Sequence, residues 1–168
     1  FLTGWRAWPA RREVVVIPHA VDAGRFAFLD HGWPPPGDRP LRLLAVGHDA
    51  PHKDQALLVD LVARLRARGH DAELTLTIDA DPPTPYVSEL LERCRATGVA
   101  DAVHFVGRTT DVERLYAAAD LALTSSVSES FGFPVLEAMA AGVPVVGSAI
   151  PATAEVAGGD AWLFAPGD

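Results

Sequence analysis

Six short apolar runs, each bounded by turn-forming residues, alternate along the chain with longer segments of helical character. The apolar runs cover residues 13–18, 41–47, 72–78, 102–107, 121–126 and 143–148. Continuous apolar runs of this length are typical of strands that are covered on both faces, and such strands lie in parallel sheets. Parallel strands that alternate with helices require right-handed crossovers. The sequence therefore predicts an α/β protein with a doubly wound, mainly parallel sheet.

Three of the segments between the runs carry clear helix signals. We expect helices within residues 54–69, 87–98 and 110–120. The first segment places its apolar side chains on one stripe, which consists of Leu57, Leu58, Leu61, Val62 and Leu65. The first two segments stop at Gly69 and Gly98, and glycine is the residue that most often ends a helix. The third opens with Thr110 and Glu113 in the spacing of a capping box.

The length of 168 residues fits one globular domain. The stretch WPPPGDRP is too rich in proline for a helix or a strand, so we expect a linker or surface loop over residues 31–40. Residues 1–30 then form an interdomain segment with the first strand, and residues 41–168 form the main domain. The chain starts with Phe1 rather than Met and stops without a closing helix, so we expect it to be an excised piece of a longer protein.

The charge balance argues against two classes of partner. Nucleic acids and anionic membranes attract clustered Lys and Arg, whereas this chain has a net charge of -8 and a pI near 5.1. No apolar window approaches the roughly 18 residues of a membrane span, and no signal sequence is recognisable. The single cysteine, Cys94, is expected to pack as a small apolar group. We expect a soluble, cytoplasmic protein without membrane contact.

Lys53 is the first candidate for a ligand contact. Open parallel sheets bind ligands at the carboxyl ends of their strands, where helix N-termini converge. Lys53 lies between the run 41–47 and the following helix, and it is the only lysine among 14 basic residues. A compact ammonium at a helix start suits a phosphate group. The alternative is a solvated residue in the first helical turn.

Glu137 is the only charged residue in the long apolar stretch that follows Glu129. A carboxylate in such a helix needs a bound hydroxyl, a cation or an exposed edge. Pro134 suits the first position of a helix, and Gly132 before it lets the backbone approach a ligand closely. The amides of residues 130–133 would then face an oxyanion. Glu137, about one turn into the helix, would accept hydrogen bonds from a vicinal diol such as that of a ribose.

These residues carry a resemblance to a known family. The stretch ESFGFPVLEAMAAGVPVV, with seven residues between Glu129 and Glu137, resembles the signature of the family 4 retaining glycosyltransferases. VHFVGRTTDVERLYAAADLALTSS and VVVIPHAVDAGRF resemble the segments of that family beside the nucleobase and between the domains. The family has two Rossmann-like domains, the GT-B fold, and binds its nucleotide-sugar donor in the C-terminal one. The resemblance implies that the chain is this C-terminal half, without the N-terminal acceptor domain and the closing C-terminal helix.

The resemblance also implies roles for individual residues. Glu137 would hold the ribose hydroxyls, Glu129 the donor sugar and Lys53 the diphosphate, with Lys53 and Glu129 as the catalytic pair. The loop 107–109 would border the base, and the amides of 130–132 would face the sugar and the distal phosphate. The implied donor site comprises Gly47, His48, Lys53, Gly107, Arg108, Thr109, Glu129, Ser130, Phe131, Gly132, Phe133 and Glu137. Such groups stabilise the charge on a leaving diphosphate without a metal, so no metal or other cofactor is expected.

Two positions depart from the family pattern. His48 stands where the family usually has Arg after the strand glycine. Imidazole is only partly charged near neutral pH and lacks the guanidinium fork, so diphosphate binding is expected to be weaker or pH-sensitive. His19 and Ala20 replace the common Asn-Gly of the interdomain segment, which implies a changed turn.

Other interpretations stay open at this stage. Asp79 and Asp81 form an Asp-x-Asp pair after a strand, as in the metal site of the other major glycosyltransferase fold. His48 and His52 suggest zinc, although no third ligand has suitable spacing. The same nucleotide cleft serves hydrolysing nucleotide-sugar epimerases. A domain that binds a nucleotide without catalysing any reaction is the non-enzymatic alternative.

Overall fold

The computed structural model describes residues 15–26 and 37–167. Its helices are the 3-10 helices η1 (Ala23–Arg25) and η2 (Pro51–Lys53) and the α-helices α1 (Gln55–Ala67), α2 (Pro85–Ala96), α3 (Val112–Ala118), α4 (Phe133–Ala140) and α5 (Pro151–Ala157). Its strands are β1 (Leu41–Ala45), β2 (Ala72–Leu76), β3 (Val103–Phe105), β4 (Leu121–Thr124), β5 (Val145–Ser148) and β6 (Trp162–Phe164). They form one sheet in the order β3-β2-β1-β4-β5-β6, and each neighbouring pair is parallel. The predicted doubly wound α/β fold is confirmed.

The order of the strands reverses between β1 and β4. From β1 the chain proceeds to β2 and β3 on one side, and from β4 it proceeds to β5 and β6 on the other. β1 and β4 are direct neighbours, with Leu43 opposite Leu121. The loops that leave the carboxyl ends of these two strands therefore diverge, and a crevice of this kind is the usual ligand site of an open parallel sheet.

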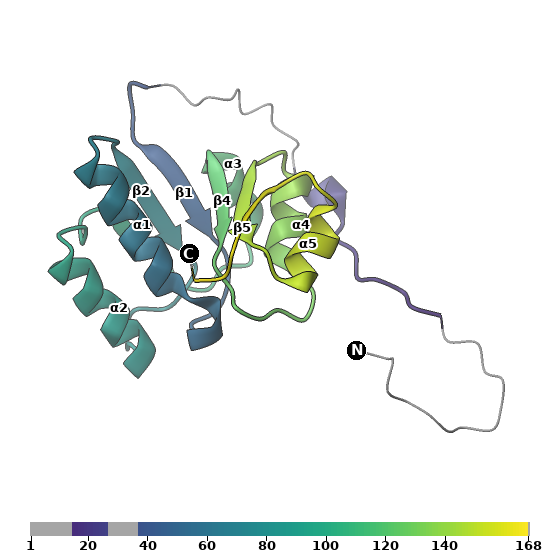
Figure 1. Cartoon of the computed structure of the whole chain (residues 1–168), viewed down its shortest axis with the longest axis horizontal. Coiled ribbons are helices and arrows are strands. Elements are labelled where there is room, and N and C mark those ends of the chain that lie inside the picture. The colour runs from purple at the N-terminus through teal and green to yellow at the C-terminus, as the bar shows by residue number, and fades with distance from the viewer. Residues whose placement is uncertain (1–14, 27–36, 168) are drawn as a thin grey trace.

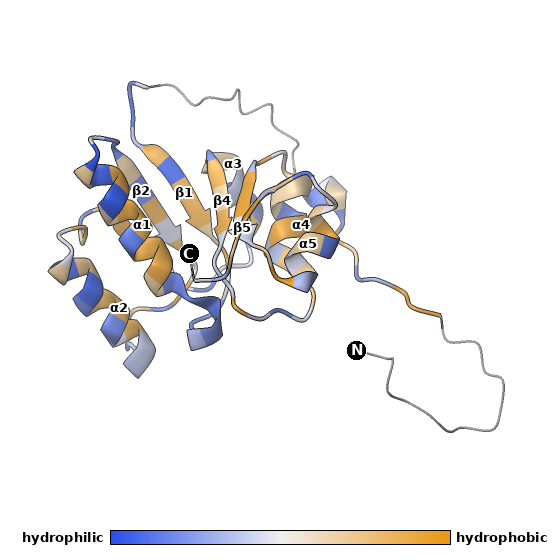
Figure 2. Cartoon of the chain, viewed as in Figure 1, coloured by the Kyte–Doolittle hydropathy of each residue, from blue (hydrophilic) through white to orange (hydrophobic). Residues whose placement is uncertain are grey.

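Helices cover both faces of the sheet, and each face has its own apolar core (Figure 1). α1 and α2 lie on one face, where Leu58 and Leu90 pack with Leu74 of β2. α3, α4 and α5 lie on the other face, where Tyr116 and Val135 pack with residues of β1 and β5. In Figure 2 the strands are largely apolar, whereas the outward sides of α1 and α2 are hydrophilic. This distribution is what burial of the strands on both faces requires.

Cys94 lies in the first of these cores with 2% of its surface exposed, as expected of a small apolar side chain. Burial raises the pKa of its thiol, so the group is not a reactive thiolate. No helix among the residues that the structure describes combines the length and the apolar character that a bilayer span needs.

The predicted strand over residues 13–18 is not formed in its described part. Residues 15–18 belong to no strand, and Val15, Val16 and Ile17 are 69%, 74% and 85% exposed. An apolar run becomes a strand only beside a strand that accepts its hydrogen bonds, and no described strand pairs with this one. Residues 37 and 38 form a turn, and residues 31–36 of the predicted loop lie outside the described ranges.

Two expected helix starts are corrected. α3 begins at Val112 after Asp111, so Thr110 and Glu113 do not form the capping box. Glu113 instead accepts a hydrogen bond from Arg25 Nε at 2.7 Å, a contact with a distant segment that the local spacing cannot predict. α4 begins at Phe133, one residue before Pro134, with Gly132 as its N-cap.

Candidate functional site

The loops that follow β1 and β4 are joined at the carboxyl edge of the sheet. Ser125 Oγ lies 2.7 Å from the carbonyl oxygen of Lys53 and 2.9 Å from that of Asp54. The amide of Val127 donates to the carbonyl oxygen of His52 at 2.9 Å. These contacts fix η2, which carries Lys53, against residues 126–133, which we call the donor loop because the sequence predicts donor contacts there.

Lys53 and Glu129 form the central contact of the site. Lys53 Nζ donates to Glu129 Oε1 at 2.5 Å, and Ser126 Oγ donates to the same oxygen at 2.7 Å. Both charged side chains are 12% exposed. A pair so little hydrated is screened weakly, so its geometry is held more firmly than that of a surface ion pair. Neither contact uses Glu129 Oε2, and this oxygen can accept a hydroxyl group of a ligand.

Gly47 and His48 continue the chain from β1 toward Lys53. The amide of Gly47 donates to Thr77 Oγ1 at 2.9 Å, which ties the end of β1 to the end of β2. A narrow pocket at this edge is lined by Gly47 and Lys53 together with residues of β2 and β4. The ring of His48 is exposed and lies 5.6 Å from the ring of His52, centroid to centroid. The backbone of this loop is therefore fixed, while the two imidazoles face solvent.

Glu137 lies near the start of α4 and has a partner on α3. Tyr116 Oη is 3.1 Å from Glu137 Oε2 and 3.1 Å from the carbonyl oxygen of Pro134. Burial raises the pKa of Glu137, and the Tyr116 hydrogen bond and the charge of Arg25 counter it only in part. Burial raises the pKa of the Tyr116 phenol as well, so the hydroxyl keeps its proton and can donate to the carboxylate. Sequence reasoning left open which group would accompany this carboxylate, and the structure identifies Tyr116.

The loop 107–109 lies at the carboxyl ends of β2 and β3. The amide of Arg108 donates to Asp79 Oδ1 at 3.2 Å, and Thr109 Oγ1 accepts the amide of Asp111 at 3.0 Å. Gly107 has a φ of +74°, and a Cβ there would lie 2.8 Å from Asp79 Oδ1. Only glycine fits this turn without strain. Asp79 thus holds the loop that the resemblance places beside the base.

The residues of the two metal alternatives lie in the loops that follow β1 and β2. Asp79 pairs with the backbone and side chain of Arg108. Among the described residues, no group of three or more His, Cys, Asp or Glu side chains could hold a metal ion. Neither the pair Asp79 and Asp81 nor the pair His48 and His52 is part of such a group.

The donor loop presents backbone amides at the start of α4. Gly132, with a φ of +101°, turns the chain into the helix. Within the described ranges, none of the amides of residues 130–132 donates a backbone hydrogen bond. Unpaired amides at a helix N-terminus can donate hydrogen bonds to an anion. The amides at this end of α4 are therefore available as the hydrogen-bond donors that the sequence predicted.

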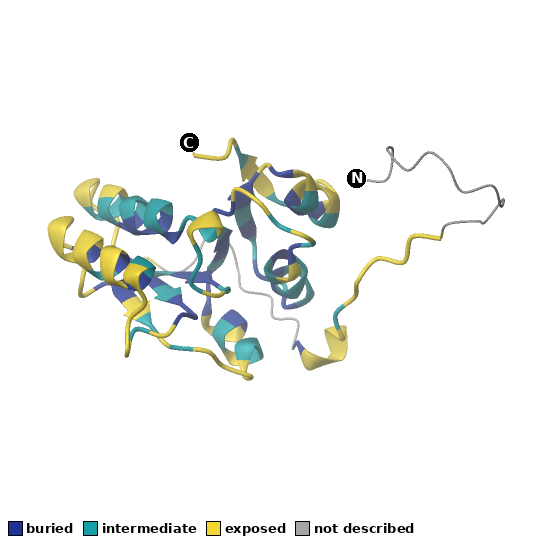
Figure 3. Cartoon of the chain, turned by 90° about the horizontal axis from the view of Figure 1, so that it is seen from below, coloured by how far each residue is buried: buried dark blue, intermediate teal, exposed yellow. Residues whose placement is uncertain are grey.

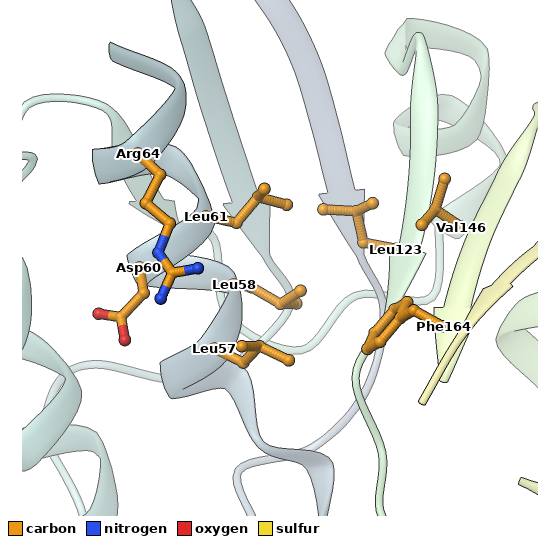
Figure 4. A pocket seen from close by; sticks show the side chains of 8 residues that line it. All are labelled: Leu57, Leu58, Asp60, Leu61, Arg64, Leu123, Val146 and Phe164. Carbon is orange, nitrogen blue, oxygen red and sulfur yellow. The ribbon is translucent and has the colours of Figure 1, made fainter. Parts of the chain in front are cut away.

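A mainly apolar hollow lies between α1 and the strands β4, β5 and β6 (Figure 4). It is lined by Leu57, Leu58, Asp60, Leu61, Arg64, Leu123, Val146 and Phe164. Asp60, the carboxylate at its rim, is already paired with Arg93 of α2. A nucleotide needs polar partners for its phosphates and ribose, and this lining offers few. The hollow is therefore not the candidate donor site.

Sequence reasoning missed three residues that hold the predicted ones. Ser126 bonds Glu129, Tyr116 bonds Glu137, and Asp79 bonds the loop 107–109. Tyr116 and Asp79 belong to other elements or loops than the groups that they position. Ser126 lies in the same loop as Glu129 and precedes it, but no spacing signal marks it. A buried carboxylate requires a donor, and that requirement is the only signal in the sequence that points toward Tyr116.

Comparisons with known proteins give the family of this chain. The model of the family described as glycosyl transferases group 1 matches residues 40–168. The chain is 35% identical to the MMP alpha-(1->4)-mannosyltransferase of Mycolicibacterium hassiacum over 93% of its own length, and 36% identical to the D-inositol 3-phosphate glycosyltransferase of Actinosynnema mirum over 89%. It covers 37% and 38% of these two proteins, so it spans little more than a third of their length.

A solved structure with a similar fold is that of HepE (Alr3699) from Anabaena in complex with UDP-glucose. It superposes with a TM-score of 0.70 and 28% identity, over 77% of this chain and 36% of that one. The open parallel sheet with its helices is the Rossmann-like fold of C-terminal domains of GT-B glycosyltransferases. The chain belongs to the glycosyl transferases group 1 family.

Proposed function

We propose that the chain is the donor-binding domain of a family 4, retaining glycosyltransferase and that it binds a nucleotide-diphosphate sugar without a metal ion. The contact that carries the proposal is the pair Lys53–Glu129, which joins the loops of the two strands at the switch point. An ammonium and a carboxylate side by side match a donor that carries phosphates next to a sugar with hydroxyl groups. Relatives named as mannosyltransferases and inositol phosphate glycosyltransferases, and a neighbour that binds UDP-glucose, support this class of substrate.

The groups of the site divide the donor between them. Lys53 and the amides of residues 130–132 bind the diphosphate, and Glu129 accepts hydroxyls of the sugar through Oε2. Glu137, oriented by Tyr116, accepts the ribose hydroxyls. The loop 107–109, held by Asp79, borders the base.

Transfer breaks the bond between the sugar and the diphosphate, and negative charge grows on the diphosphate oxygen that leaves. Lys53 and the amides of residues 130–132 would stabilise this charge, and groups that are held in position beforehand do so without rearrangement during the reaction. The groups that bind the acceptor lie on an N-terminal domain outside this chain. We place the protein in the cytoplasm, where nucleotide sugars are available to it.

The direct test is a calorimetric titration of the chain with UDP, GDP and ADP, each with and without EDTA. We expect at least one of them to bind, with an affinity that EDTA leaves unchanged. Lys53→Ala and Glu137→Ala should each weaken that binding, whereas Arg95→Ala, an exposed substitution on α2, should not. Binding that survives both site substitutions would refute the assignment, and binding lost in EDTA would refute the metal-independent part.

Enzyme and binding module are separated by a second measurement. The longer protein that includes the acceptor domain should transfer sugar with retention at the anomeric carbon, and the 168-residue chain should not. Turnover by the chain alone would contradict the proposed division between the domains. Binding without turnover in the longer protein would favour the non-enzymatic alternative, and release of free sugar product by hydrolysis would favour an epimerase-like reaction.

A further inference from the structure

Three rings connect the segment before η1 to the donor loop. The ring centroid of His19 lies 5.2 Å from that of Phe131 and 5.3 Å from that of Phe133, and the two phenyl rings are 5.0 Å apart. The planes of His19 and Phe131 are inclined by 71°, an edge-to-face arrangement. Centroid separations and tilts of this kind are the attractive geometries of aromatic pairs.

The segment that carries His19 is anchored on the domain at its other end. Phe26 is 6% exposed, and its ring lies 5.9 Å from that of Tyr116. Arg25 forms an ion pair with Glu113 of α3. Asp22 Oδ1 accepts the amide of Gly24 and caps η1. His19 therefore reaches the donor loop from a fixed base, while residues 15–18 before it are exposed (Figure 3).

The two halves of the donor loop differ in how they are held. Its first half is bonded through Val127 to His52 and through Glu129 to Lys53 and Ser126. Its second half turns through Gly132 and has amides without backbone partners in the described ranges. The ring contacts of Phe131 and Phe133 are the described interactions that restrain this second half from outside.

We propose that His19 is a positioning residue of the donor site: its ring holds Phe131 and Phe133, and through them the amides of residues 131–133, where they meet the sugar and distal phosphate. The inference rests on the proposed function. His19 itself is exposed, so its ring adds little to the core of the domain. Its removal should therefore loosen the loop without unfolding the protein, which separates positioning from a purely structural role.

The first test needs no nucleotide. In the ¹⁵N relaxation of the full 168-residue chain, His19→Ala should lower the order parameters of the Phe131, Gly132 and Phe133 amides from the rigid range of about 0.85 to below about 0.6. His19→Phe, which keeps a ring, should leave them rigid. The matched control is His104→Ala, which removes another exposed imidazole on β3. Unchanged order parameters in His19→Ala would overturn the inference.

The second test separates the parts of the donor. UMP, UDP and UDP-glucose serve as probes, with the guanosine or adenosine set in their place if guanine or adenine is the preferred base. His19→Ala should weaken the binding of UDP-glucose about tenfold and the binding of UMP less than about twofold, because only UDP-glucose reaches residues 131–133. Equal weakening of both, or of neither, contradicts the inference. If the unaltered chain binds none of the probes, the proposed function fails, while the relaxation measurement still decides whether His19 holds the loop.

Discussion

Lys53 Nζ and Glu129 Oε1 lie 2.5 Å apart although 76 residues separate them in the sequence. The two residues follow β1 and β4, the neighbouring strands at which the sheet reverses its order. Each side chain is mostly shielded from water, so each depends on the other for its charge to be tolerated. The pair thus contributes to the fold of the site and provides an ammonium and a carboxylate for a ligand that needs both.

Removal of the Lys53 ammonium should weaken the binding of nucleoside diphosphates but not of the nucleoside. Lys53→Met keeps the length of the side chain, and a charged hydrogen bond is worth roughly 1.5–3 kcal/mol, so UDP should bind at least about tenfold more weakly. Uridine, which lacks phosphate, should bind as before. Calorimetric titration of both ligands tests this, with Arg95→Met on α2 as the control. A uniform loss for UDP and uridine would mean that Lys53 supports the fold rather than the phosphates.

The unpaired Glu129 in that variant is a second, separable effect. Lys53→Met leaves a carboxylate that is 12% exposed without its cation, which should lower the melting temperature at pH 7. Adding Glu129→Gln should restore most of the stability and none of the UDP affinity. Thermal melts of the single and the double variant measure the coupling. A double variant that melts as low as the single one would show that the ion pair is not what the substitution disturbed.

Glu137→Gln should weaken nucleotide binding and raise the stability of the fold by an amount that depends on pH. Because burial raises the pKa of Glu137 above its ordinary value of 4.5, the folded protein holds this proton more tightly than the unfolded chain. The free energy of unfolding therefore falls as the pH rises from about 4.5 through the folded-state pKa, and it stays lower above it. Glutamine cannot ionise and escapes that loss.

We accordingly expect Glu137→Gln to melt higher than the unaltered protein at pH 8, with a smaller difference at pH 4, and to bind nucleotide about tenfold more weakly. The amide oxygen of glutamine can still accept a hydrogen bond from the Tyr116 hydroxyl, so the local packing is kept. Glu155→Gln, at an exposed position of α5, is the control. A difference in melting temperature that is the same at both pH values would contradict the assigned ionisation.

Strand positions followed well from the sequence wherever an apolar run had a neighbour. The runs 41–47, 72–78 and 121–126 begin with β1, β2 and β4, and each run extends two residues beyond the end of its strand. The run 13–18 has the same composition, but a strand also requires a pairing partner, and composition does not contain that information. β6, which has three residues, lies outside the six predicted runs.

The site followed from the sequence only as far as its motif reached. Glu129, Glu137 and Lys53 stand out by charge in apolar or arginine-rich surroundings. Tyr116 and His19 do not, because their partners belong to other elements and no spacing rule connects a residue to a side chain across a fold. The local pattern marks the proposed ligand contacts and leaves open the groups that orient them.

Gly107→Ala should disturb the base end of the site. A Cβ at position 107 meets Asp79 Oδ1 at 2.8 Å and also requires an unfavourable positive φ. Gly98→Ala is the matched control, since Gly98 has a φ of +71° with no atom within 4 Å of the added Cβ. Both should lose about 1 kcal/mol of stability from the backbone, and only Gly107→Ala should also weaken nucleotide binding. Equal affinities of the two variants would mean that the loop 107–109 does not border the base.

Asp120→Asn should separate stability from binding altogether. Asp120 is 3% exposed at the start of β4, at the opposite edge of the sheet from the donor loop, and accepts hydrogen bonds from the Arg39 and Arg42 side chains and from the Arg42 amide. Burial alone would raise its pKa, but these donors outweigh burial and hold the pKa well below its usual range. The depressed pKa adds stability above the unfolded value of about 3.9, which is lost as the pH falls toward the folded value. Breaking such a pair should lower the melting temperature at pH 7 by roughly 6–12 °C, and by less at pH 3, with nucleotide affinity unchanged below the melt. Thermal melts at both pH values test the stability, and a titration at a temperature 20 °C below the lower melting midpoint tests the affinity. A loss of nucleotide affinity in the folded variant would mean that the two edges of the sheet are coupled.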